Sequence, residues 1–166
     1  MGKKGIVWIE TILYVLISLA VIGLLLAVIQ PKIAQIKDSI IIDQTKQSLN
    51  KIDETILNTK SATGMRLYSE LKLGQGQILI NGTEDSISWI YPSIYKYSEI
   101  GKTIRDGSIY TTTEQAGTAY KINLKLKYDT NLTFNGLDQE KIIQAASISY
   151  KLWFANKGRY IDITLE

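Results

Sequence analysis

The hydrophobic pattern of this chain of 166 residues changes character along its length. No charged residue occurs from Thr11 to Ile29, and this run ends at Gln30-Pro31. A helix from Ile12 to Ile29 would be about 27 Å long at about 1.5 Å per residue, close to the roughly 30 Å of a hydrocarbon core. The pattern therefore predicts a membrane span or a hydrophobic export signal over residues 6–30.

Beyond Pro31 the apolar positions follow a helical period. Apolar residues recur at intervals of three and four in two runs, first at Ile33, Ile36 and Ile40, and then at Ile42, Leu49, Ile52 and Ile56, where Thr45 occupies the position between Ile42 and Leu49. Polar residues occupy the other faces, which is the pattern of an amphipathic helix. We predict an amphipathic continuation over residues 31–60, kinked or locally opened at Pro31, with the distal half of its apolar stripe packed on the chain's own domain.

The period changes to two after Ser61–Gly64, which predicts a β-rich domain over residues 61–166. The clearest strand is Thr118–Tyr128, where apolar side chains alternate with lysines and one asparagine. The lysine-bearing face of the sheet that contains this strand would be exposed to water. The other predicted strands are Met65–Leu73 and Gln77–Ile80 as a hairpin, Ser86–Tyr91 ending at Pro92, Ile109–Thr113, and Ala146–Phe154 with Tyr160–Leu165 as a last hairpin. The predicted fold class is α+β: a long N-terminal helix followed by an antiparallel β-sheet or β-sandwich.

The amino-acid composition limits the chemical functions that the chain can perform. The chain has no cysteine and no histidine, so it has no disulfide, thiolate metal ligand or histidine base. The acidic pairs Asp53-Glu54 and Glu84-Asp85 do not have the arrangement of a catalytic or calcium site. We therefore expect that the chain is not an enzyme and that it binds neither a cofactor nor a metal ion. The net charge of +3 is too small to indicate nucleic-acid binding.

The aromatic residues of the β region are expected to fill the core and cross-strand pairs rather than to form a sugar-binding surface. These residues are Trp89, Tyr91, Tyr95, Tyr97, Tyr110, Tyr120, Tyr150, Trp153 and Phe154.

The short segment before the apolar run carries the most specific signal. Lys3-Lys4-Gly5 precedes Ile6-Val7-Trp8-Ile9, and Glu10 stands at the entrance of the span. A carboxylate in a membrane span is costly unless it has a partner. Cleavage after Gly5 would create an α-amino group on Ile6, four residues before Glu10, in the same or a neighbouring chain. It would also place Glu10 in the first helical turn, which favours negative charge.

This combination resembles the class III signal peptide of type IV pilins and pilin-like proteins, and the short leader and Ile-rich body resemble archaeal members. The resemblance implies that residues 1–5 are a leader, that a prepilin peptidase cleaves after Gly5, and that Ile6 becomes the new terminus. It also implies that Glu10 pairs with the terminal amine of an adjacent subunit, setting the register of a filament. Bacterial pilins usually start with Phe-Thr-Leu, so N-methylation of Ile6 is not implied.

On this interpretation the chain is a pilin or minor pilin. Its partners are copies of itself or other pilin-like subunits, the peptidase, and lipid before assembly. It would span the cytoplasmic membrane once and then reach a cell-surface filament, with its β domain extracellular. Asn81 and Asn131 begin Asn-x-Thr sequons, so a glycoprotein is conceivable. The alternatives are a plain membrane-anchored β binding module and a secretion pseudopilin that forms no long filament.

Overall fold

A computed structural model describes residues 3–166, with side chains from Trp8 onward, so part of the expected leader lies outside the described residues. One helix, α1 (Lys3–Lys60), is followed by β-strands, and this confirms the predicted α+β class. The helix is unbroken through Pro31 and ends where Ser61–Gly64 predicted. The chain forms two compact units, Met1–Lys37 and Asp38–Glu166, which are described separately below.

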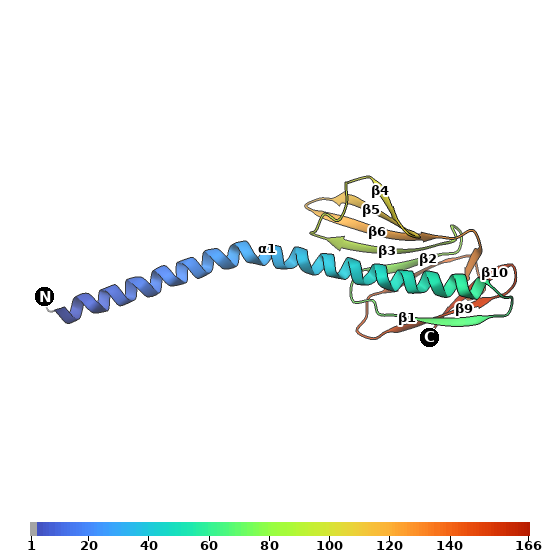
Figure 1. Ribbon diagram of the computed structural model, residues 1–166, viewed down its shortest axis with the longest axis horizontal. Coiled ribbons are helices and arrows are strands. Elements are labelled where there is room, and N and C mark those ends of the chain that lie inside the picture. Colours follow the sequence, from blue (N-terminus) through green and yellow to red (C-terminus); the bar gives the residue numbers. More distant parts are fainter. Residues whose placement is uncertain (1–2) are drawn as a thin grey trace. The chain divides into compact units, whose positions relative to one another are not determined.

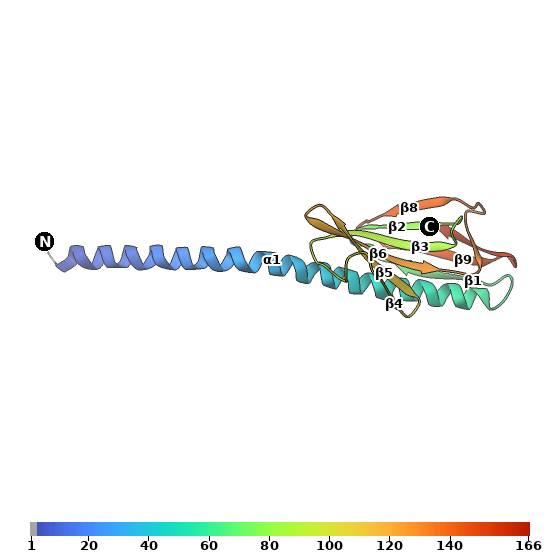
Figure 2. The ribbon, with the colours of Figure 1, turned by 90° about the horizontal axis from the view of Figure 1, so that it is seen from above.

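The larger sheet of the second unit has six strands, each antiparallel to its neighbours. Figure 2 shows their order across the sheet. In that order they are β4 (Thr103–Asp106), β5 (Ile109–Ala116), β6 (Ala119–Lys127), β3 (Ser86–Ser93), β2 (Gln77–Asn81) and β8 (Glu140–Gln144).

The smaller sheet has four strands. Their order is β1 (Arg66–Leu71), β9 (Tyr150–Asn156), β10 (Tyr160–Leu165) and β7 (Asn131–Phe134). Strand β7 runs parallel to β10, whereas the other pairs of this sheet are antiparallel.

The hydrophobic core lies between these sheets and the distal part of α1, which Figure 1 shows between β3 of one sheet and β1 of the other. The helix contributes a stripe at intervals of three and four residues, namely Ile42, Thr45, Leu49, Ile52 and Ile56. Each apolar member of this stripe is 0 or 1% exposed. Trp89 and Phe154 are the largest fully buried side chains. The predicted packing of the distal stripe on its own domain is confirmed.

The predicted first hairpin is wrong. Strand β1 pairs with β9 in the smaller sheet, and β2 pairs with β3 and β8 in the larger one. The glycine-containing segment between them is a crossover between sheets. Gly76 has a φ of +76°, and a Cβ on it would lie 2.6 Å from the carbonyl oxygen of Ile90. Only glycine therefore suits this crossover.

The predicted last hairpin is confirmed, because β9 and β10 pair, although β9 begins at Tyr150. The predicted strands Ile109–Thr113 and Thr118–Tyr128 correspond to β5 and β6, which pair with each other, but β5 continues to Ala116. The sequence analysis missed β4, β7 and β8. The predicted end of β3 before Pro92 is also wrong, because Pro92 lies inside that strand. The register of β2 stops opposite Ile90, so Pro92 occupies an edge position on that side and removes no hydrogen bond to β2.

Candidate functional site: an apolar helix without a partner in its own chain

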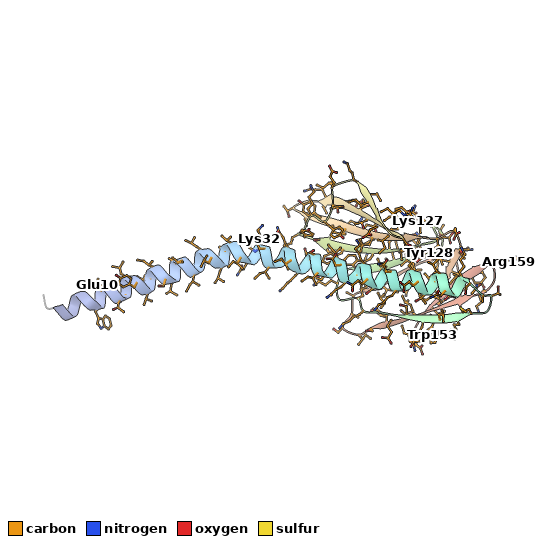
Figure 3. The ribbon with its side chains drawn as sticks, viewed as in Figure 1. Glu10, Lys32, Lys127, Tyr128, Trp153 and Arg159 are labelled. Carbon is orange, nitrogen blue, oxygen red and sulfur yellow. The ribbon has the colours of Figure 1, made fainter. Side chains whose placement is uncertain are left out.

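The first unit exposes its apolar side chains on every face of α1. From Trp8 to Ile29 the large hydrophobic side chains are between 44% (Ile29) and 73% (Trp8) exposed. Figure 3 shows them projecting on all sides of this part of the helix. By length and composition, this is a helix that can cross a membrane, and it lies near the N-terminus. Apolar residues around the whole circumference indicate a surrounding apolar medium rather than one packed face.

The polar group of Ser18 inside this stretch is satisfied within the helix. Its hydroxyl donates a hydrogen bond of 2.8 Å to the carbonyl oxygen of Tyr14, one turn earlier. A lipid or a neighbouring apolar helix therefore does not have to supply a partner for it.

Glu10 is exposed on α1 (Figure 3). Among the side chains that the structure describes, from Trp8 onward, none forms an ion pair with it. Gly5 and Ile6 lie in α1 but before the first described side chain, so the expected pairing of Glu10 with an amine on Ile6 lies outside the described contacts. The carboxylate is available to a partner beyond these residues.

Gly23 is a second position that its own chain does not explain. A Cβ at this position would meet nothing within 4 Å. Glycine in a helix interior is less favourable than alanine by about 0.8–1 kcal/mol, so its presence has a cost without a steric reason in the monomer. Together with Ala27 it forms the small-xxx-small spacing that allows close approach of a second helix.

Asp38 fastens the beginning of the second unit's helix to β3. Its carboxylate accepts hydrogen bonds from the hydroxyls of Tyr91 (2.6 Å) and Ser93 (2.8 Å) and from the amide of Ile94 (2.7 Å). Burial alone would raise the pKa of Asp38, but these hydrogen bonds stabilise the charged form and hold the pKa below its ordinary value. Burial and the neighbouring Asp38 charge raise the pKa of Tyr91.

Two further contacts fasten the helix along its length. The Lys46 ammonium lies 2.5 Å from a carboxylate oxygen of Asp106 and 3.1 Å from the Tyr97 hydroxyl. At the far end, the Asn156 side-chain amide donates to the carbonyl oxygens of Thr59 (3.1 Å) and Lys60 (3.2 Å). These carbonyls are among those that a helix leaves without partners at its C-terminus.

The two sequons have different surroundings. Asn81 is 7% exposed, its side-chain nitrogen donates to Glu140 at 2.7 Å, and its side-chain oxygen accepts from the Glu84 amide at 2.9 Å. Asn131 is exposed at the first residue of β7. A glycan on Asn81 would be attached to the buried nitrogen that donates to Glu140, so Asn131 is the more accessible of the two sequons.

The expectation that aromatic residues fill the core is correct for Trp89, Tyr91 and Phe154. Trp153 forms the other expected arrangement, a cross-strand pair: it lies on the outer face of the smaller sheet opposite Tyr68, and the two ring centroids are 5.1 Å apart. The period of two places Trp153 on the opposite face from its neighbours Leu152 and Phe154, which are both buried. Its side-chain nitrogen donates to Glu166 at 2.8 Å.

Three of the four residues in the acidic pairs Asp53-Glu54 and Glu84-Asp85 interact with other parts of the folded domain. Asp53 is buried on the core-facing side of α1 and Glu54 is exposed. The Asp53 charge adds to burial in raising the pKa of Tyr128. Glu84 pairs with Lys125 at 2.5 Å, and Asp85 accepts the amide of Leu132 at 2.8 Å.

The sequence analysis did not single out Asp38 or Asn156, because their partners are distant in sequence. A charged residue on an amphipathic helix has no local feature that separates a fastening residue from a solvated one. Comparisons with protein-family models, with curated proteins and with solved structures found no match to this chain.

Proposed function

We propose that this chain is a structural subunit, a pilin or minor pilin, of a type IV pilus-like filament at the cell surface. A membrane precursor is processed by a prepilin peptidase after Gly5, and the mature chain polymerises through its N-terminal helix. The observation that carries this proposal is one unbroken helix whose apolar residues are exposed on all sides up to Ile29 and whose continuation is built into a folded domain. Such a helix requires lipid first and, after assembly, neighbouring helices.

Glu10 and Gly23 favour assembly over simple anchoring. Neither residue helps a single chain in lipid, because an intramembrane carboxylate needs a partner and a helical glycine lowers helix stability. In a bundle of identical helices, both residues make stabilising contacts with a neighbouring helix. Glu10 neutralises the terminal amine of an adjacent subunit, and Gly23 allows that subunit's helix to approach closely.

Mass analysis of the N-terminus of the mature protein tests processing. The expected mature chain begins at Ile6, and a chain that retains Lys3-Lys4 would contradict the proposal. In addition, Glu10→Ala should leave cleavage intact and reduce incorporation into filaments beside wild-type subunits. Glu54→Ala is the matched control, because Glu54 is an exposed acid on the distal part of the same helix.

A Gly23→Leu variant tests helix packing separately from charge. A Cβ added at this position meets nothing within 4 Å, so membrane insertion and cleavage should be unchanged while filament formation is lost. Val28→Leu is the control, since Val28 is 68% exposed and a slightly larger side chain replaces another apolar one. Uncleaved single chains in purified membranes would instead favour a tethered β module, and cleaved chains in short assemblies would favour a pseudopilin.

A further inference from the structure

The two ends of the larger sheet carry different loops. Strands β3, β5 and β8 run in the same direction, because β3 and β5 are antiparallel to β6, and β3 and β8 are antiparallel to β2. Asp38 lies where these strands end, bonded to the amide of Ile94, the first residue after β3. The Asp38-end loops of the sheet are residues 72–76, 94–102, 117–118 and 145–149. The far-end loops are residues 82–85, 107–108, 128–130 and 135–139.

The Asp38-end loops are basic, whereas the far-end loops are acidic. The first set contains three lysines and one acid, namely Lys72, Lys96, Lys102 and Glu99. Lys102 pairs with Glu99 at 2.7 Å, but the exposed Lys72 and Lys96 form no ion pair with a described side chain. The far-end loops contain four acids and no lysine or arginine. An anionic surface is therefore attracted to the Asp38 end of the sheet and repelled by the other end.

The Asp38-end loops also expose large apolar side chains. Ile94, Ile100 and Ile148 are 49%, 41% and 71% exposed. Ile94 follows β3, Ile100 lies opposite Thr113 of β5, and Ile148 lies in the loop after β8. Neighbouring strands are about 4.8 Å apart, so the four strand steps from β5 to β8 spread these side chains over about 19 Å. Together with the lysines they form a broad apolar and basic rim, which suits a flat partner.

The chain itself limits how far this rim can be from a membrane that holds the apolar helix. The uncharged run ends at Ile29, and Asp38, where the second unit begins, is nine residues later. Even a fully extended chain spans only about 3.5 Å per residue, so Asp38 stays within about 31 Å of the end of the run whatever the arrangement of the two units. Because Asp38 is bonded to Ile94, the rim is on the side of the domain that is tied most directly to the span.

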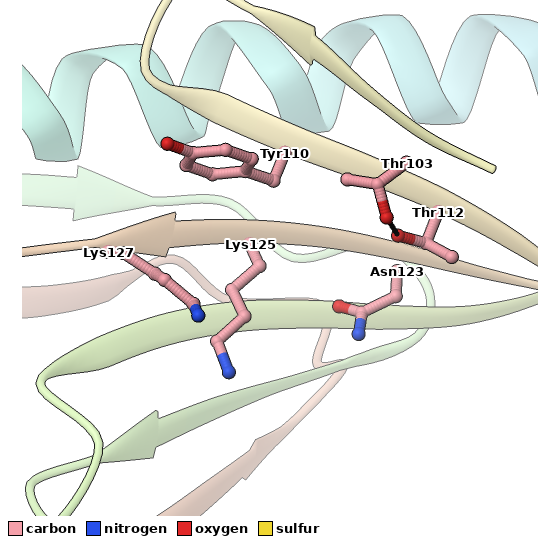
Figure 4. A pocket seen from close by; sticks show the side chains of 6 residues that line it. All are labelled: Thr103, Tyr110, Thr112, Asn123, Lys125 and Lys127. Carbon is pink, nitrogen blue, oxygen red and sulfur yellow. Dashed lines mark hydrogen bonds between the residues drawn. The ribbon is translucent and has the colours of Figure 1, made fainter.

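Positive charge alone does not define such a surface. The lysine-bearing face of the larger sheet contains a depression lined by Thr103, Tyr110, Thr112, Asn123, Lys125 and Lys127 (Figure 4). No aliphatic side chain lines this depression, and Lys125 is paired with Glu84. These features are typical of a sheet face that contacts water. Binding to a membrane surface requires apolar area in addition to basic residues, and only the rim offers both.

We propose that this rim docks on the surface of a lipid bilayer that contains anionic lipids, while the chain is a membrane precursor. Ile94, Ile100 and Ile148 enter the boundary between the head groups and the acyl chains. Lys72 and Lys96 meet the lipid phosphates, and each basic residue near an anionic surface adds to the attraction. This inference rests on the membrane span of the proposed function, and it adds a second membrane contact made by the β domain.

A second copy of this chain is the alternative occupant, because its acidic far-end loops could meet the basic rim. Those loops offer only one exposed large apolar side chain among the described residues, Leu137, against three isoleucines of the rim. The apolar part of the rim is therefore matched better by lipid than by the far end of another subunit.

The test uses the absence of cysteine, which allows one labelled position at a time. Ser147→Cys, in the Asp38-end loops, carries a fluorescent label, and Thr83→Cys, an exposed position of the far-end loops, is the matched control. The full-length chain is reconstituted into vesicles of phosphatidylcholine, alone or mixed with phosphatidylglycerol. A lipid with a spin label on its head group quenches a fluorophore that docks beside it. Quenching should be stronger at position 147 than at position 83, and it should increase with phosphatidylglycerol.

Substitutions then separate charge from apolar contact. Lys96→Gln should lower the ratio of docked to undocked chains about five-fold, as expected for one lysine at an anionic surface. Lys127→Gln, on the lysine-bearing sheet face, is its control and should change nothing. Ile148→Ser should lower the ratio by about ten-fold or more, since an apolar side chain leaves the lipid. Leu137→Ser, in the far-end loops, should have no effect.

Equal quenching at the two labelled positions, no dependence on phosphatidylglycerol, or equal losses in variants and controls would overturn the proposal. A signal at position 147 that depends on the protein-to-lipid ratio at constant lipid composition would assign the rim to a second copy and would also overturn it. The fluorescence of buried Trp89 in unlabelled protein checks that each variant is folded. Flotation with the vesicles tests the span separately, so a chain that inserts without docking would leave the filament proposal untouched.

Discussion

The two parts of α1 have the same backbone conformation and different partners. Beyond Asp38, Ile42, Leu49, Ile52 and Ile56 form one stripe that is buried in a core built from both sheets, whereas Ile40 and Leu57 are exposed. From Trp8 to Ile29 the apolar residues surround the helix and all the large ones are exposed. Helical periodicity therefore shows where a helix forms, and the width of the apolar surface shows what kind of surroundings it needs.

The contrast also explains where polar contacts are concentrated. Asp38, Lys46 and Asn156 fasten the distal part through side chains of strands and loops. In the proximal part, the hydrogen bond of Ser18 is made within the helix itself. A helix part that is apolar on every face gains from hydrogen bonds made within the helix, whereas a part that supports a domain also gains from specific long-range contacts.

The largest difference is expected between two leucine-to-alanine substitutions, one in each part of α1. Leu49→Ala should lower the free energy of unfolding of the domain by about 2–5 kcal/mol, since Leu49 is 0% exposed and its loss leaves a cavity. Leu24→Ala should leave that free energy unchanged within about 0.5 kcal/mol, because Leu24 is 70% exposed. Denaturant titration in detergent, followed by the fluorescence of buried Trp89, measures both variants. Equal losses would show that the two parts do not differ as described.

Removing the charge of Asp38 should have the next largest effect. Asp38→Asn should destabilise the domain at neutral pH by about 1–3 kcal/mol, because three hydrogen bonds to a carboxylate are weakened. Asp43→Asn, at an exposed position on the same helix, is the control and should change stability by less than about 0.5 kcal/mol. The same titration compares the two. A similar loss in both variants would remove the fastening role given to Asp38.

The pH dependence of that difference sharpens the comparison further. The pKa of Asp38 is lowered in the folded chain, so its contribution is fully present above the ordinary value of 3.8 and is lost as the pH falls through the lowered pKa. The stability gap between wild type and Asp38→Asn should therefore be constant from pH 7 to about 5 and shrink below about 4. Thermal unfolding across this range measures the gap. A gap that widens on acidification would contradict the sign.

A smaller effect is expected at the distal end of the helix. Asn156→Ala removes the donor to the carbonyl oxygens of Thr59 and Lys60 and should cost about 1–2 kcal/mol. Hydrogen exchange should show increased opening of the last helical turn and no change near Ser18. Asn58→Ala, at an exposed position of the same turn, provides the control. Unchanged exchange in that last turn would show that the cap contributes little.

The sequence predicted the features that depend on neighbouring residues. The helix, its end after Lys60, the buried stripe, the strands β5 and β6 and the hairpin β9–β10 are all encoded within short windows. The pairing of β1 with β9 was not predictable in this way, since a glycine-containing turn before β2 looks locally like a hairpin whether or not the chain changes sheets. Short edge strands such as β4, with four exposed residues, carry no alternation of buried and exposed positions to detect.

The candidate site was predicted to a similar extent. The sequence identified the apolar run and Glu10, because both stand out by composition alone. It could not identify Asp38, whose role comes from strand β3, or the buried state of Asn81, which pairs with Glu140 on the neighbouring strand β8. Residues whose function comes from distant partners require coordinates.

The cap on the distal helix has a consequence for the order in which the protein matures. The Asn156 amide and the carbonyl of Thr59 are 97 residues apart in sequence. Strand β1 likewise can form its pairing only after β9 has been synthesised. During synthesis the apolar helix therefore emerges long before the strands that complete its domain. On the proposed function, a membrane would accept the first unit while the second is still an incomplete chain, because the domain closes only once residues 150–165 are available. Insertion would then precede folding, and lipid would be the first folding partner of the helix.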